Sequence, residues 1–131
     1  MSQSILFRLA RDSIEEVFQA RNSIDKTRLL QEHPLLSAKV PITLKLYRNQ
    51  ELKGTHATED LQSSLLENII IAAKKAAFED TVHAPLSVLE YPYCEIELLL
   101  KAPEGDMLER DKAMIEENMV QDLSKMGNFT I

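Results

Sequence analysis

Residues 42–89 constrain the fold more than any other segment, because the spacing of their apolar residues changes once along the way. Apolar and polar residues alternate from Ile42 to Tyr47, which is the pattern of a strand with one buried face. Residues 48–51 have the composition of a turn, so residues 52–58 are predicted to return as an antiparallel partner. A serine-capped, alanine-rich helix is then predicted to run to Phe78. This order predicts a sheet with a helix packed closely on one face.

The flanking segments continue these two patterns. Further helices are predicted over residues 4–21, 26–32 and 107–126, and a third strand over residues 93–101. Pro34 ends the second helix, because the residue before a proline avoids the helical region. We therefore predict an α+β fold in which an antiparallel sheet packs against helices. We divide it into a body, residues 1–103, and an acidic helical appendage, residues 104–131, packed on that body.

Length and composition favour one cytoplasmic domain. A chain of 131 residues can bury a single core, and no apolar run approaches the roughly 20 residues that cross a bilayer. Arg8, Arg11 and Asp12 interrupt the apolar stretch near the N-terminus, so it does not resemble a secretory signal. The one cysteine, Cys94, excludes an intrachain disulfide framework and is compatible with a reducing compartment.

The net charge of −6 disfavours nucleic acid as a partner. Seven acidic residues against two basic ones lie between Glu104 and Asp122, so the rest of the chain is nearly neutral. A domain that binds through phosphate contacts usually carries a basic excess, because neutralising phosphates releases counterions and drives binding. General affinity for DNA or RNA is therefore not predicted.

Three polar residues are candidates for chemistry. His56 follows Gly54 in the second predicted strand, and a glycine there is typical of a bulge or of close backbone approach. Asp80 and His83 lie in the loop after the central helix, so the three side chains could form an acid–base pair or a metal site. The spacing contains no His-x-x-x-His, cysteine pair or phosphate-binding loop. We therefore favour a bulged strand with an exposed histidine, and predict no metal and no cofactor.

The other candidates have structural interpretations. Cys94 occupies an inward strand position, where a cysteine usually behaves as a small hydrophobic residue. Glu95 and Glu97 are predicted to meet Lys45 or Lys53 across the sheet rather than to catalyse a reaction. The final predicted helix carries an apolar stripe. We predict that this stripe packs on its own domain or, alternatively, forms a contact with a second copy of the chain or another protein. Its members are Met107, Ile115, Met119, Leu123 and Met126.

The order of segments resembles that of the AMMECR family. The strings that carry the resemblance are ITLKLYRNQELKGTHAT, LLENIIIAAKKAAFED and APLSVLEYPYCEIELLL, with LARDSIEEVF near the N-terminus. Family members show an LRGCIG signature after the first strand and an Asp-Pro-Arg-Phe sequence after the central helix. Here Lys53 and Gly54 match the Arg-Gly of that signature, whereas Thr55 replaces its cysteine. Asp80 is retained, but His83 replaces the phenylalanine.

The resemblance implies the α+β fold and a remnant of the family's suspected cleft. Its candidate residues are Lys53, Gly54, Thr55, His56, Asp80 and His83. Because the signature side chains are replaced, the favoured function is non-catalytic binding or scaffolding, with a small ligand or a protein as the partner. The alternative is an enzyme that uses His56, Asp80 and His83 as an acid–base or metal site. The family's association with radical-SAM and Memo-type proteins implies that such an enzyme would work in their pathway.

Overall fold

The computed structural model describes residues 4–59, 61–102 and 105–115, and shows the predicted α+β fold. Its helices are α1 (Ile5–Gln19), α2 (Lys26–Glu32) and α3 (Leu65–Phe78), and its strands are β1 (Ile42–Arg48), β2 (Glu51–Ala57), β3 (Cys94–Ala102) and β4 (Gly105–Asp111). Two short 3-10 helices, Pro34–Ser37 and Tyr91–Tyr93, precede β1 and β3. No helix in the described ranges is long and apolar enough to cross a membrane.

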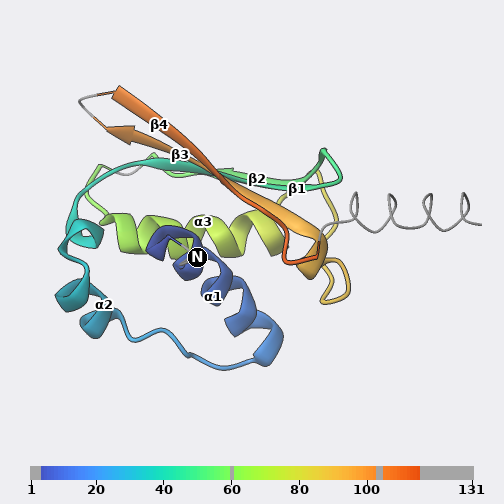
Figure 1. Ribbon diagram of the computed structural model, residues 1–131, viewed down its shortest axis with the longest axis horizontal. Helices are drawn as coiled ribbons and strands as arrows, with labels where there is room; N and C mark the ends of the chain where they lie inside the picture. The colour runs from blue at the N-terminus through green and yellow to red at the C-terminus, as the bar shows by residue number, and fades with distance from the viewer. Residues whose placement is uncertain (1–3, 60, 103–104, 116–131) are drawn as a thin grey trace, which may run out of the picture.

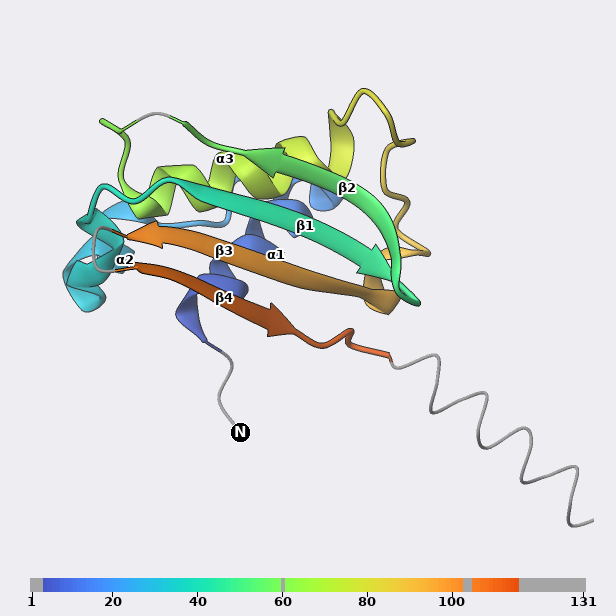
Figure 2. The ribbon, with the colours of Figure 1, turned by 90° about the horizontal axis from the view of Figure 1, so that it is seen from above.

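The strands form one antiparallel sheet in the order β2-β1-β3-β4, and α1 and α3 lie against one of its faces (Figures 1 and 2). The predicted alternation is confirmed, because the residues that face the helices are almost completely buried. They are Ile42, Leu44 and Leu46 of β1 and Cys94, Ile96, Leu98 and Leu100 of β3. The core therefore lies between one face of the sheet and the two long helices.

Strand β2 lies unusually close to α3. A Cβ atom added to Gly54 would lie 1.9 Å from the carbonyl oxygen of Ala76, a distance that real side chains do not reach. The small side chains of α3 permit this approach, since Ala72, Ala73, Ala76 and Ala77 are all buried. The helix begins as predicted, because the hydroxyl of Ser64 accepts the backbone N–H of Glu67. Gly54 is thus a packing glycine whose backbone touches the helix.

The buried Glu16 of α1 connects distant parts of the chain. Glu16 accepts the backbone N–H groups of Ser23 and Ile24 and forms an ion pair with Lys74 at 2.8 Å. Burial opposes ionisation, but these bonds outweigh it and lower the pKa of Glu16. The charged carboxylate therefore joins α1, the segment that leads to α2, and α3.

The predicted helix over residues 107–126 is wrong in its first part, where the chain forms β4. Residues 105–111 pair with β3 along their whole length, with Met107 opposite Leu100. The sheet decides this conformation, because β3 would otherwise expose a row of unpaired backbone groups. Arg11 of α1 holds the end of β4: its Nε donates to Asp111 at 2.9 Å, and its Nη2 donates to the carbonyl oxygen of Lys112.

The described residues of the predicted apolar stripe therefore do not lie on one face of a helix. Met107 lies on β4 and is 53% exposed, and Ile115 follows the strand and is 42% exposed. Met119, Leu123 and Met126 lie outside the described residues, as does the remainder of the predicted appendage from residue 116 onward. The first part of that appendage belongs to the same sheet as the body.

Strand β4 also changes the predicted partner of Glu97. Lys45 is opposite Glu97 in the β1–β3 register, but the carboxylate forms its ion pair with Arg110 of β4. The guanidinium of Arg110 also stacks over the ring of Tyr47. The prediction of Lys45 or Lys53 as the partner is thus wrong for Glu97, because it did not include a strand beside β3. Lys53 instead lies near Glu51 and Glu90.

Candidate functional site

Asp80 joins the loop after α3 to the outer edge of β2. Its Oδ2 accepts the backbone N–H of Thr55 at 2.9 Å, and its Oδ1 accepts that of Val82 at 2.8 Å. Oδ2 also lies 3.0 Å from Nδ1 of His83. The Val82 N–H and then His83 lower the pKa of Asp80 to about 2. Asp80 is therefore a charged carboxylate whose acceptor sites bind its own loop and the neighbouring strand.

His83 lines a cleft of about 140 Å³ between β2 and the loop that leads to β3. The cleft is lined by Glu51, Leu52, Lys53, His83, Ala84, Leu86 and Glu90. An ionised carboxylate can only accept a hydrogen bond, so Nδ1 of His83 carries the proton in its contact with Asp80. The other ring nitrogen, Nε2, does not take part in that contact. Of the six residues that the resemblance indicated, Lys53 and His83 line this cleft.

Charged side chains that line this cleft pair with one another and with Arg48, which does not line it. Oε2 of Glu90 lies 3.4 Å from Nη1 of Arg48 and 3.9 Å from Nζ of Lys53. Lys53 also lies 3.5 Å from a carboxylate oxygen of Glu51, and Arg48 stacks on the ring of Tyr93. These partly exposed pairs are long, and each contributes little to stability because water screens the charges.

The remaining candidates do not converge on the cleft. Gly54 faces Ala76 of α3, and Thr55 contributes its backbone N–H to Asp80. His56 is opposite Leu44 on β1, and its pKa is lowered by burial and by Lys75 of α3. Within residues 4–59, 61–102 and 105–115, no group of three or more His, Cys, Asp or Glu side chains is arranged to hold a metal ion. The structure therefore pairs Asp80 with His83 but does not bring His56 to them.

Cys94 is a core residue, as its inward position predicted. Its side chain is fully buried, and burial raises the pKa of the thiol to about 11. A thiol with this pKa is almost entirely protonated at neutral pH, so it is a poor nucleophile.

Sequence reasoning did not include Arg48 and Glu90 among the site residues. These residues are far apart in the chain, and they meet because Arg48 lies opposite Cys94 in the β1–β3 register. The turn that places Glu90 does have a signal in the sequence, since the hydroxyl of Ser87 accepts the Glu90 N–H as a cap. The ion pair itself depends on which two strands are neighbours.

Comparisons with known proteins agree with the fold. A protein-family model described as AMMECR1 matches residues 7–118. The crystal structure of uncharacterized protein PH0010 from Pyrococcus horikoshii is similar to this structure, with 26% sequence identity and a TM-score of 0.66. The similarity covers 75% of this chain and 50% of that one, so the chain spans about half the length of this neighbour. None of the curated proteins compared with the chain matches it.

Proposed function

Because this chain belongs to the AMMECR1 family, we propose that it is a non-catalytic binding or scaffolding domain whose protein partner contacts the cleft beside β2. The observation that supports a binding role is the mutual pairing of the cleft's charged groups. Asp80 binds its own loop and β2, whereas Lys53 lies close to Glu51 and Glu90. A catalytic acid or base must instead direct an available atom at a substrate.

The size and surroundings of the cleft favour a protein over a small ligand. Its volume of about 140 Å³ is below the roughly 300–1,000 Å³ of most small-molecule sites. The same loop carries three exposed apolar side chains, Val82, Val88 and Leu89, of which Leu89 is 81% exposed. Exposed apolar groups beside separable charges are typical of surfaces that a partner covers. A protein could bury these side chains and take over the ion pairs of Lys53 and Glu90.

Substitutions in the loop test this proposal. We expect Leu89→Asp to abolish binding of a partner isolated with the wild-type protein, because a buried unpaired carboxylate opposes association. Leu61→Asp is the matched control, since Leu61 is also exposed but precedes α3. Binding of the purified partner is measured by calorimetry for the wild type and both variants. Equal affinity of the Leu89 variant and the wild type would contradict docking at this loop.

The enzyme hypothesis keeps one supporting observation, the 3.0 Å contact between Asp80 and His83. A carboxylate that orients a histidine is a common element of general-base catalysis. The third residue of the proposed site, His56, is not part of this contact. Burial and Lys75 lower the pKa of His56, and Glu79 opposes that change. Turnover of a candidate substrate that is lost in both His56→Ala and His83→Ala would support this alternative and refute the binding proposal. A radical-SAM or Memo-type gene beside the coding gene would place such an enzyme in their pathway.

Homodimerisation through the apolar stripe is a separate proposal. The exposed Met107 and Ile115 are the described members of that stripe. A dimer mass by light scattering that reverts to the monomer mass in Met107→Glu would support it. A wild-type monomer at high concentration would remove it.

A further inference from the structure

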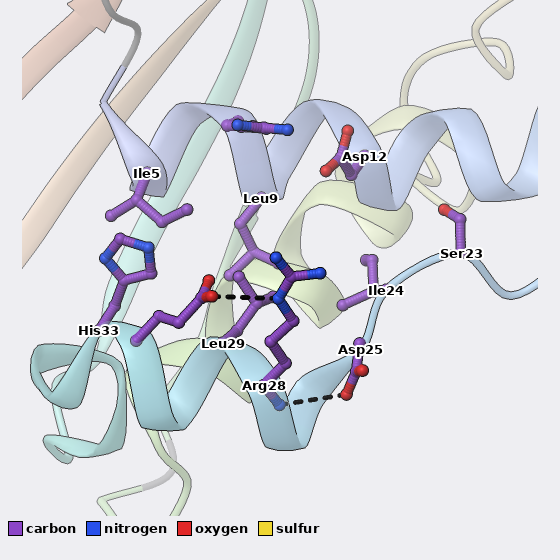
Figure 3. A pocket seen from close by; sticks show the side chains of 11 residues that line it. Ile5, Leu9, Asp12, Ser23, Ile24, Asp25, Arg28, Leu29 and His33 are labelled. Carbon is purple, nitrogen blue, oxygen red and sulfur yellow. Dashed lines mark hydrogen bonds and ion pairs between the residues drawn. The ribbon is translucent and has the colours of Figure 1, made fainter.

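A second cavity, of about 270 Å³, lies between α1, α2 and the segment that connects them (Figure 3). Its apolar lining consists of Ile5, Leu9, Ile24 and Leu29, which project from both helices and the connection. No side chain of α2 is completely buried, so the two helices do not close this space. The volume lies just below the usual range for drug-sized ligands and suits a smaller molecule.

Some charged groups around the cavity are already engaged in holding α2 together. Nε of Arg28 lies 3.0 Å from a carboxylate oxygen of Glu32, one turn further along the helix. The carboxylate of Asp25 caps α2 by accepting the backbone N–H of Arg28. Figure 3 shows both interactions as dashed lines on the α2 side of the cavity.

The charged groups on the α1 side are not engaged in this way. The side chains of Arg8 and Asp12 line the cavity, and within the described part of the chain neither forms an ion pair or a hydrogen bond with another side chain. They are four residues apart on one helix, so their Cβ atoms are neighbours about 6 Å apart. Burial and the nearby Glu15 raise the pKa of Asp12, and Arg8 opposes the rise. A cationic group beside Asp12 would therefore relieve an unfavourable charge.

We propose that this cavity binds a free amino acid with an aliphatic side chain. The ligand's ammonium group would pair with Asp12, its carboxylate with Arg8, and its side chain would contact Leu9, Ile24 and Leu29. An α-amino acid carries two opposite charges on one carbon, which matches an aspartate and an arginine one helical turn apart. A ligand with only an anionic group would leave Asp12 unpaired, and a simple amine would leave Arg8 unpaired. The cavity shares no lining residue with the cleft beside β2, so this proposal is independent of the proposed partner.

Titration of the full-length, ¹⁵N-labelled protein by NMR tests the proposal on the wild type. The ligands are L-leucine, L-isoleucine, L-valine and L-methionine, and two leucine analogues serve as probes of the charges. We expect saturable shifts at Ile24 and Leu29 with at least one amino acid. The analogue 4-methylpentanoate lacks the ammonium group and leucinamide lacks the carboxylate, so each should bind at least about tenfold more weakly, because each loses a charged pair.

Variants then assign the two charges. Asp12→Asn and Arg8→Gln should each weaken amino-acid binding at least about tenfold, whereas Glu59→Gln and Arg21→Gln should not change it. Glu59 and Arg21 are exposed and do not line the cavity, so they are matched controls. Three results would overturn the proposal. The first is the absence of a saturable shift with any of the four amino acids, and the second is binding of either analogue as tight as that of leucine. The third is a loss of affinity in the control variants as large as that in Asp12→Asn and Arg8→Gln. The analogue comparison needs no variant, so it holds even if a substitution disturbs the fold.

Discussion

The cleft beside β2 and the cavity between α1 and α2 differ in where their charged groups find partners. Asp80 binds two backbone N–H groups and His83, so its negative charge is stabilised within the protein. Asp12 lies partly buried near Glu15, with Arg8 as its favourable neighbour. One carboxylate therefore has a lowered pKa and the other a raised pKa. One carboxylate thus binds two other parts of the fold, whereas within the described residues the other forms no ion pair or hydrogen bond with another side chain.

The largest effect on stability is expected from a substitution of Gly54, the residue at which β2 packs directly on α3. Gly54→Ala places a Cβ atom against the backbone of Ala76, so β2 or α3 must move. We expect the free energy of unfolding to fall by about 3 kcal/mol or more, measured by urea denaturation. Ala57→Ser, at an exposed position of the same strand, is the control. A loss below about 1 kcal/mol for Gly54→Ala would show that the helix yields easily.

A paired substitution tests the difference between the two carboxylates directly. Asp80→Asn should lower the midpoint of urea unfolding at pH 7, because the charged form of Asp80 is the one that the folded state favours. Asp12→Asn should leave the midpoint unchanged or raise it slightly, because the folded state disfavours the charged form of Asp12. Equal losses in both variants would refute the distinction between the two sites.

The pH dependence should differ in sign between the same two residues. The contribution of Asp80 to stability is present above its ordinary pKa near 4 and is lost as the pH falls toward about 2. The raised pKa of Asp12 has the opposite consequence, since its unfavourable charge is relieved on acidification. The stability difference between wild type and Asp80→Asn should therefore shrink between pH 4 and pH 2. Thermal unfolding at several pH values measures it, and a constant difference would contradict the assignment.

The smallest effect on stability is expected at His83. Its ring is partly exposed and contacts Asp80, whose two backbone hydrogen bonds remain when the ring is removed. His83→Gln should change the free energy of unfolding by less than about 1 kcal/mol while weakening partner binding at the cleft. A large loss of stability would show that the histidine, rather than the carboxylate, holds the loop.

Local signals predicted most of the fold because they depend on neighbours in the chain. The alternation in β1, the serine cap of α3 at Ser64 and the stop before Pro34 all appear in the structure. The exception is β4, whose short polar sequence has weak periodicity of its own. Its conformation follows from pairing with β3 and from the anchor at Arg11, and neither contact can be read from residues 105–111 alone.

Residue types alone did not decide how the six candidate residues are arranged. The resemblance indicated Gly54, Asp80 and their neighbours as candidates, and the carboxylate of Asp80 accepts the backbone N–H of Thr55 on β2. The pattern could not show that Gly54 serves helix packing, or that Lys75 lowers the pKa of His56 while His56 stays apart from the Asp80–His83 pair. Direction of a side chain depends on strand register and on the helix opposite it.

The sequence by itself determined the α+β class, the buried faces of β1 and β3 and the ends of α2 and α3, because these follow from residue spacing and local hydrogen bonds. The tertiary structure determined the fourth strand, the pairing of Arg48 with Glu90 and the unlike environments of Asp12 and Asp80. These features depend on groups far apart in the chain, and a charge acquires its role only when folding selects its neighbours.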